Sequence, residues 1–161
     1  NLLSKILLIM FSLFFVSTNL SLAENKIISP YFASIKWNEA KVRTGPGQQY
    51  PIRWIFNKKN LPIEILREYE RWLKIRYLDG DEGWMHKRLV SRSRYVMLNG
   101  NAQVLRNKPD SSSNAILVIE NRVVAKLQKC NLKWCQVSIK EKNGWVLKSY
   151  LWGVYLSEII D

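Results

Sequence analysis

The stretch from Lys41 to Trp54, KVRTGPGQQYPIRW, decides the fold, because it joins a short strand to a tight Gly-Pro-Gly turn. A proline flanked by glycines suits a type I or type II turn, with Gly47 free to adopt a positive φ. Arg43, Tyr50 and Trp54 lie close to this turn in the sequence. Such a stretch fits a phosphate-binding loop, a peptide groove or the corner of a small β-barrel. The rest of the chain is needed to choose among these three interpretations.

The chain repeats itself at an interval of about 62 residues, which indicates an internal duplication. Ala40-Lys41-Val42 recurs as Ala102-Gln103-Val104, and the WLKI of residues 72–75 recurs as the WCQV of residues 134–137. After one deletion in a turn, the GWMHK of residues 83–87 matches the GWVLK of residues 144–148. Ordered matches in one register, broken once at a turn, predict two copies of one structural unit.

Each copy is expected to be a small antiparallel β-barrel. Residues 61–66 (LPIEIL) and 72–77 (WLKIRY) alternate with a period of two, as strands with one buried face do. Clusters of turn-forming residues separate them, and no stretch after residue 23 carries a convincing helical stripe. The expected fold class is therefore all-β, with two tandem barrels over residues 34–95 and 96–161, preceded by a linker over residues 24–33.

The first 23 residues are expected to be a cleavable signal peptide. Lys5 precedes an apolar run from Ile6 to Val16, and the small-x-small pattern Ser21-Leu22-Ala23 follows. The run is too short for a membrane span, which needs about 18–20 apolar residues. Retention of this segment as an anchor, or its burial as a helix, is the alternative. We expect cleavage after Ala23 and a periplasmic or secreted protein.

These motifs resemble the bacterial SH3 domain family (SH3b). The resemblance rests on AKVRTGPGQQYPI (residues 40–52), on W-x-K-I and on EGWMHKRLV (residues 82–90), and residues 103–155 look like a divergent second copy. The second copy replaces the Gly-Pro-Gly element with Asn107-Lys108-Pro109, so a function of that loop is doubtful there. The resemblance implies two SH3-like barrels of five to six strands and a non-enzymatic binding role, often toward the cell wall or its stem peptides.

Cys130 and Cys135 are the only cysteines, and we expect them to form a disulfide. Export to an oxidising compartment favours pairing, and the two residues flank a predicted hairpin turn. A metal or redox pair is the alternative, but a zinc site needs about four ligands and His86 is the only histidine. No metal and no cofactor is predicted.

The residue pattern argues against an enzyme. A catalytic thiol needs a nearby base, and His86 would have to serve from the other repeat. The acidic residues near Asp79 crowd a turn, where a weak calcium site is a remote alternative, and the GPG element lacks the partners of a phosphate-binding loop. A small wall hydrolase that uses His86 or Glu68 remains a third hypothesis.

The chain carries a formal net charge of +12, which favours anionic partners. Residues 34–95 contribute +7 and residues 96–161 contribute +4. Weak attraction to an anionic membrane surface is one expectation, whereas export argues against a specific nucleic-acid target. The alternative is that the basic residues are scattered over the surface and bind no partner. This alternative is weakest for the cluster formed by Arg67, Arg71, Lys74 and Arg76.

The tryptophans divide into core and surface positions. The alternation of residues 72–77 places Trp72 outward, and Trp134 stands out in the same way, whereas Trp84 and Trp145 are expected in the barrel cores. Trp37 and Trp152 are candidates to pack between the units. Packing of Trp72 under a neighbouring loop is the alternative to a binding role.

The expected ligand-binding residues are Arg43, Tyr50, Trp54 and Trp72, which would line a cleft of the first barrel. The expected function is recognition of peptidoglycan or cell-wall peptides through the first barrel, with the second barrel mainly structural. A periplasmic adaptor or envelope-assembly factor that binds a protein and not the wall is the alternative. The sequence does not indicate an oligomeric state.

Overall fold

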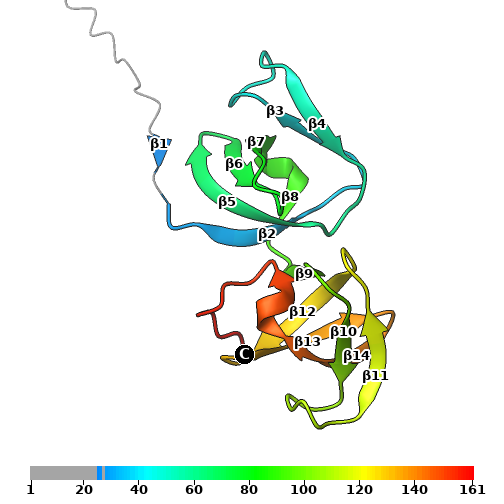
Figure 1. Ribbon diagram of the computed structural model, residues 1–161. Helices are drawn as coiled ribbons and strands as arrows, with labels where there is room; N and C mark the ends of the chain where they lie inside the picture. Colours follow the sequence, from blue (N-terminus) through cyan, green and yellow to red (C-terminus); the bar gives the residue numbers. More distant parts are fainter. Residues whose placement is uncertain (1–24, 27) are drawn as a thin grey trace, which may run out of the picture.

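The computed structural model describes residues 25, 26 and 28–161, which form two consecutive β-sheets (Figure 1). The expected all-β class is confirmed: apart from the strands, the regular structure of these residues consists of two 3-10 turns, η1 (Lys87–Leu89) and η2 (Lys148–Tyr150). No helix in this part of the chain has the length and apolar character that crossing a membrane requires. The expected signal peptide, residues 1–23, lies outside the described residues.

The first sheet follows the strand order β4-β3-β7-β6-β5-β2-β8, with β1 paired to β5. Its strands are β1 (Asn25–Lys26), β2 (Tyr31–Ile35), β3 (Ala40–Arg43), β4 (Ile52–Phe56), β5 (Pro62–Tyr69), β6 (Trp72–Arg76), β7 (Glu82–His86) and β8 (Val90–Ser91). All pairs are antiparallel. The expected linker, residues 24–33, instead contributes β1 and the start of β2 to this sheet, because both strands pair with the long strand β5.

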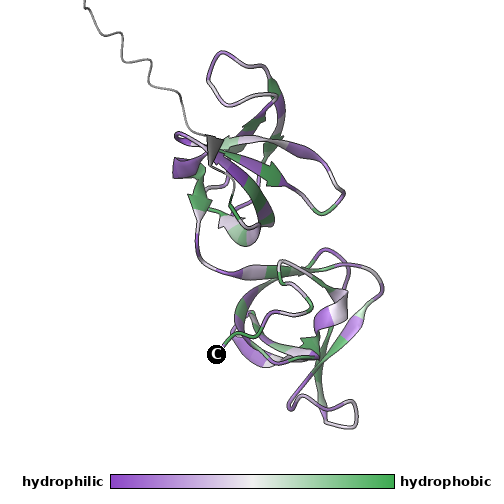
Figure 2. Ribbon diagram, turned by 90° about the vertical axis from the view of Figure 1, so that its left-hand side faces the viewer, coloured by the Kyte–Doolittle hydropathy of each residue, from purple (hydrophilic) through white to green (hydrophobic). Residues whose placement is uncertain are grey.

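The second sheet repeats the same path, in the order β11-β10-β14-β13-β12-β9-β15. Its strands are β9 (Tyr95–Leu98), β10 (Gln103–Arg106), β11 (Ala115–Ile119), β12 (Val124–Cys130), β13 (Trp134–Ile139), β14 (Lys142–Leu147) and β15 (Leu151–Trp152). Hydrophilic and hydrophobic residues alternate along the strands of both units, as barrels with one buried face require (Figure 2).

The duplication is confirmed, but its register differs from the sequence match in the first strands. Arg43 pairs with Trp84, and Arg106 pairs with Trp145, so Arg43 corresponds to Arg106, 63 positions later. The match of Ala40 with Ala102 is therefore wrong by one residue: Gln103 takes the place of Ala40. The turn after β4 has five residues (57–61), whereas the equivalent turn after β11 has four (120–123), which restores the interval of 62 from β5 onward.

Gly83 explains why Trp84 faces outward. A Cβ atom on Gly83 would lie 2.4 Å from Cγ1 of Val42, so this position points into the core without room for a side chain. The next residue, Trp84, is consequently half-buried on the outer face, and Met85 fills the core. The second barrel repeats this arrangement with Gly144, Leu105, Trp145 and Val146. The prediction that these two tryptophans fill the barrel cores is wrong.

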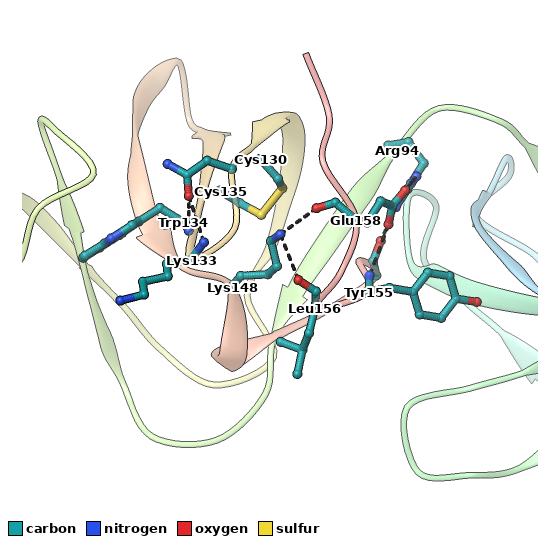
Figure 3. The surroundings of a disulfide bond; sticks show 11 residues. Arg94, Cys130, Lys133, Trp134, Cys135, Lys148, Tyr155, Leu156 and Glu158 are labelled. Atoms are coloured by element: carbon teal, nitrogen blue, oxygen red, sulfur yellow. Dashed lines mark hydrogen bonds and ion pairs between the residues drawn. A yellow bond between two sulfur atoms is a disulfide. The ribbon is translucent and has the colours of Figure 1, made fainter.

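A disulfide between Cys130 and Cys135 closes the hairpin of β12 and β13, as predicted (Figure 3). The two residues are direct cross-strand partners, with Cα atoms 4.1 Å apart. The backbone of Cys130 also exchanges two hydrogen bonds with Ile160, 2.8 and 3.0 Å long. The disulfide-bonded hairpin therefore holds the end of the chain against the second barrel.

Lys148 is buried beneath this C-terminal tail. Its amino group donates to the carbonyl oxygens of Glu158, at 2.6 Å, and of Leu156, at 3.3 Å (Figure 3). Burial lowers the pKa of Lys148, and the charge of Glu158 opposes this effect. The Glu158 carboxylate in turn accepts two hydrogen bonds from Arg94, at 2.6 and 3.0 Å, so the tail is fixed at two points.

The two barrels are joined by aromatic and hydrogen-bonded contacts. Trp152 of the second barrel donates from Nε1 to the carbonyl oxygen of Pro62, at 3.0 Å, and its ring meets Phe32 edge-on at 4.9 Å. The ring of Tyr155 lies 4.6 Å from the same phenylalanine. Trp152 therefore packs between the units, as expected, whereas Trp37 is 53% exposed and donates to the carbonyl oxygen of Arg88.

Candidate functional site

Trp72 stands on the outer face of the first barrel, at the start of β6. Its partner across the hairpin is His86, the last residue of β7, and the two rings meet edge-on with centroids 5.3 Å apart. Nδ1 of His86 accepts a hydrogen bond from the backbone N–H of Arg88, at 3.2 Å. Burial, together with the charges of Arg88 and Arg71, lowers the pKa of His86, so its imidazole is neutral at neutral pH.

Arg43 brings the loop after β3 to this pair of rings. It lies at a register shift of the β3–β4 pairing, and its Nη1 donates to the carbonyl oxygen of Tyr50, at 2.7 Å. The loop is also closed by the N–H of Thr44, which donates to the carbonyl oxygen of Pro51 at 3.0 Å. The guanidinium thereby joins the two ends of the loop to each other.

The Gly-Pro-Gly turn is required for space and not for an unusual backbone angle. A Cβ atom on Gly45 would lie 2.4 Å from Cδ1 of Tyr50, whose ring covers this position. Gly47 does not have the positive φ that the sequence suggested, since in the described residues only Gly80, Gly100 and Gly153 among glycines do. Gly45 thus lets the tyrosine ring lie against the turn, and Gly47 leaves room for the side chain of Gln49.

A hollow of about 320 Å³ lies between this loop and the two rings. Its lining combines charged, aromatic and amide side chains: Glu39, Lys41, Arg43, Gln48, Trp72, His86, Arg88 and Leu89. A second, more open hollow of about 690 Å³ shares Gln48, Trp72 and His86 and continues toward Glu70 and Arg71. We call the two together the Trp72 groove. Cations outnumber carboxylates in it, and a lysine–carboxylate pair, Lys41 with Glu39 at 3.4 Å, lies at its edge.

The four expected binding residues do not all meet in this groove. Arg43 and Trp72 line it. Tyr50, 39% exposed, supports the loop from beneath Gly45 and lines neither hollow. Trp54 packs edge-on against Phe56, with ring centroids 5.9 Å apart, and is likewise outside both hollows.

Sequence reasoning missed several lining residues, of which His86 is the most informative. The sequence contains a signal for His86, because the turn between β6 and β7 makes Trp72 and His86 cross-strand partners on one face of the sheet. Gln48, Glu39 and Arg88 come from loops and from η1, whose approach to the rings no periodicity encodes.

Half of the basic cluster expected around the β5–β6 hairpin is neutralised. Lys74 pairs with Glu82 at 2.8 Å, and Arg76 contacts both Glu82, at 2.9 Å, and Glu64, at 3.1 Å. Hydrogen bonds from Lys74 and Arg76 lower the pKa of Glu82. Two of the four clustered cations are therefore bound to acids of their own barrel and not free for a ligand.

The second barrel has a hollow at the corresponding place, with a different lining. It has a volume of about 160 Å³ and is lined by Ala102, Gln103, Val104, Arg106, Ser111, Trp134 and Leu147. Arg106 and Trp134 correspond to Arg43 and Trp72, but Leu147 stands where the first barrel has His86. The duplication has therefore kept the arginine–tryptophan pair and removed most of the charge around it.

The loop of the second barrel keeps its backbone course without the glycines. Arg106 donates from Nη1 to the carbonyl oxygen of Ser113 at 2.7 Å, the same bond that Arg43 makes to Tyr50. Because a serine replaces the tyrosine ring, the position of Gly45 is free for a side chain, and Lys108 occupies it. The Asp110 carboxylate closes the turn by accepting from the N–H of Ser112 at 2.9 Å.

In the part of the chain that the structure describes, no three histidine, cysteine or acidic side chains gather as metal ligands would. Asp79, in the turn considered for calcium, accepts instead a hydrogen bond from Arg122 of the second barrel, at 2.8 Å.

The strand order, the repeated groove and the short 3-10 turn before each last strand define a tandem pair of small SH3-like β-barrels. The bacterial SH3 domain family matches twice, over residues 36–92 and 99–153, and the chain belongs to this family. No curated protein matches the chain.

Solved structures with a similar chain course include NlpC1 and NlpC2 from Trichomonas vaginalis and an NlpC/P60 family protein from Bacillus cereus. NlpC1 is 10% identical with a TM-score of 0.36, over 80% of this chain and 48% of that one. NlpC2 is 11% identical with a TM-score of 0.36, over 77% and 48%. The Bacillus cereus protein is 12% identical with a TM-score of 0.34, over 75% and 55%. The chain thus spans about half the length of these proteins.

Proposed function

We propose that the protein is an exported, non-catalytic module that recognises the peptide portion of peptidoglycan through the Trp72 groove of its first barrel. Membership of the bacterial SH3 domain family supports this, because these domains are typically non-catalytic binding modules. The observation that carries the proposal is the groove itself, which sets the rings of Trp72 and His86 beside Arg43 and Arg88.

The lining of the groove matches the chemistry of short cell-wall peptides, which combine free carboxylates, amino groups and small side chains. Arg43 and Arg88 are suited to bind a carboxylate, since guanidinium–carboxylate hydrogen bonds are among the stronger ones. Glu39 offers a partner for an amino group. Trp72 supplies a flat apolar surface for an aliphatic stem or a sugar ring, as tryptophans at binding sites commonly do.

A recognition role is also consistent with how the reactive side chains are used. Both cysteines form the disulfide, which removes a thiol nucleophile. Nδ1 of His86 accepts a hydrogen bond from the backbone of η1, and the ring lies against Trp72 and not against a nucleophile. Its neutral ring is a hydrogen-bonding surface for a ligand.

Retention on purified, insoluble peptidoglycan tests the proposal. We expect the wild-type protein to co-sediment, and the Trp72→Ala, Arg43→Ala variant to bind about tenfold or more weakly, because aromatic and arginine anchors dominate binding energies. Trp134→Ala, Arg106→Ala is the matched control, since it removes the same pair from the second barrel. Equal retention of the wild type and the first-barrel variant would discard the groove as the wall-binding site.

A protein-binding adaptor is the second candidate, and the edge strand β4 favours it. This strand ends the first sheet and leaves Ile52 43% and Ile55 41% exposed. An edge strand with apolar side chains can pair with a strand from a partner along its open side. Chemical crosslinking in the envelope distinguishes the two: the adaptor hypothesis expects one discrete partner that is lost in Ile55→Lys, with no retention on peptidoglycan.

A further inference from the structure

We propose that a basic hollow between the two barrels binds a ligand that carries several phosphate groups, independently of the Trp72 groove. The hollow has a volume of about 400 Å³. Its lining comes from both barrels and contains no carboxylate and five cations, which are Lys58, Lys59, Arg122, Lys126 and Lys140. We call it the inter-barrel hollow.

The lysines of this hollow are unneutralised, unlike several cations on the first barrel. Among the described residues, Lys58, Lys59, Lys126 and Lys140 are exposed and take part in no ion pair, whereas Lys74, Arg76 and Lys87 are all paired with glutamates. The fifth cation, Arg122, is held at 2.8 Å by Asp79 of the first barrel. Four like charges around one hollow repel each other, so an anion that bridges them gains from all four.

The two barrels bring these charges together through equivalent turns. The turn after β4 provides Lys58 and Lys59, and the turn after β11 provides Arg122; both turns lie where the barrels meet (Figure 1). The bonds of Trp152 to Pro62 and of Arg122 to Asp79 hold the turns in place. Neither barrel alone contains the site, and the packing of the two barrels forms it before a ligand binds.

Three turn residues of the hollow have a backbone conformation that favours glycine. Asn60, Arg122 and Lys140 have φ angles of 66°, 65° and 48°. Lys140 and Glu141 form the two-residue turn between β13 and β14, where Asn-Gly is the preferred pair. A lysine at such a position makes the folded protein less stable than an asparagine or glycine would, and strained residues of this kind cluster at functional sites. Its side chain contributes to the hollow instead.

The lining fits phosphate better than it fits a carboxylic acid. Lysine ammonium groups on flexible stems surround the space as point charges and can follow several phosphate oxygens at once. The side chains of Asn60, Asn121 and Ser138 add uncharged hydrogen-bond donors from both barrels. Inorganic tripolyphosphate, which concentrates several charges in a short chain, is therefore the probe of choice.

Isothermal titration calorimetry of the full chain with tripolyphosphate tests the site. We expect saturable binding that weakens as salt is added, and a loss of affinity of about tenfold or more in Lys58→Gln, Lys126→Gln. The matched control is Lys108→Gln, Lys133→Gln, which removes the same charge from exposed positions outside the hollow and is expected to bind like the wild type. Absence of binding to the wild type, or an equal loss in the control, would overturn the proposal.

A further variant separates binding from folding. Lys140→Asn is expected to weaken tripolyphosphate binding severalfold while its melting temperature stays level or rises, because asparagine tolerates a positive φ better than lysine does. Unchanged affinity in both this variant and the lysine pair would overturn the proposal. Neither variant touches the Trp72 groove, so retention on peptidoglycan is expected to persist in both.

Vesicles of phosphatidylglycerol identify the source of the phosphate. Flotation of the protein with these vesicles, abolished by tripolyphosphate and by Lys58→Gln, Lys126→Gln, would support a lipid headgroup as the ligand. Tripolyphosphate binding without flotation would support a soluble phosphate ester. Flotation that neither the competitor nor the variant reduces would count against the hollow.

Discussion

The hydroxyl of Tyr155 donates a hydrogen bond to Oε1 of Glu64, 2.8 Å away, and thereby connects the C-terminal tail of the second barrel to the first. Glu64 is buried, and its other oxygen pairs with Arg76. Burial and the bond to Glu64 raise the pKa of Tyr155, so the phenol stays protonated and remains a donor throughout the physiological range. One carboxylate thus stabilises both the outer face of the first barrel and the interface.

We expect Tyr155→Phe to lower the free energy of unfolding by about 1–3 kcal/mol, because it leaves one oxygen of a buried carboxylate without its donor. Urea unfolding followed by tryptophan fluorescence measures this change. Tyr150→Phe is the control, since that tyrosine packs against the core of the second barrel and its hydroxyl makes no hydrogen bond within the described residues. Equal stability of the two variants would show that the Tyr155 bond contributes nothing at the interface.

The contact of Gly45 with Tyr50 predicts a rescue between the two positions. Gly45→Ala should destabilise the first barrel by about 1–3 kcal/mol, because the added methyl group overlaps the tyrosine ring. Tyr50→Ser, which copies the serine of the second barrel, should make the same alanine nearly harmless. Thermal unfolding of the two single variants and the double variant gives the coupling energy. Additive losses would contradict a direct contact.

The repeat and the alternation of residues 61–66 and 72–77 were enough to predict two all-β barrels. Cys130 and Cys135 were also predictable, because their places beside a hairpin turn made them cross-strand partners. The exact register of the duplication was not, since each copy changes length in different turns and the short match of Ala40 to Ala102 pointed one residue away. The expectation that Trp84 lies in the core was wrong, because the glycine before it occupies the core position.

The candidate site was predictable only in part. Arg43 and Trp72 belong to strands, and their outward direction follows from the period of two. Tyr50 lies in a loop, and nothing in the sequence distinguishes a ring that covers a glycine from one that faces a ligand. The inter-barrel hollow could not be predicted, because Lys58 and Lys126 meet only through the packing of one barrel on the other.

The ion pairs of Glu82 predict a loss of stability in acid. Hydrogen bonds from Lys74 and Arg76 hold the pKa of Glu82 below its ordinary value of 4.5. The folded state therefore binds a proton less readily than the unfolded state. The stabilisation is complete above pH 4.5 and disappears as the pH falls through the lower, folded-state pKa. We expect it to amount to about 1 kcal/mol or less, since the pair is partly exposed.

Glu82→Gln isolates this contribution. The variant should be less stable than the wild type at pH 6, and the gap should be smaller at pH 3, where Glu82 is largely protonated in the unfolded state and the ion pairs favour the folded state less. Urea unfolding at the two pH values measures the difference. Glu120→Gln serves as the control, because Glu120 is exposed and makes no ion pair in the described part of the chain. A stability gap that is as large at pH 3 as at pH 6 would contradict the role of these ion pairs.

The disulfide is expected to act through the C-terminal tail as well as through its own hairpin. Cys130→Ser, Cys135→Ser should lower the free energy of unfolding by about 2 kcal/mol, the value that the chain-entropy relation assigns to so short a loop.

Cys130 also anchors the backbone of Ile160, and the same tail holds Lys148 and Arg94 through Glu158. Loosening the hairpin should therefore expose the amide of Ile160 first. In hydrogen exchange, we expect this amide to lose protection in the variant while the amides of β5 and β6 keep theirs. Uniform loss of protection over both barrels would mean that the disulfide stabilises the whole chain and not the tail in particular.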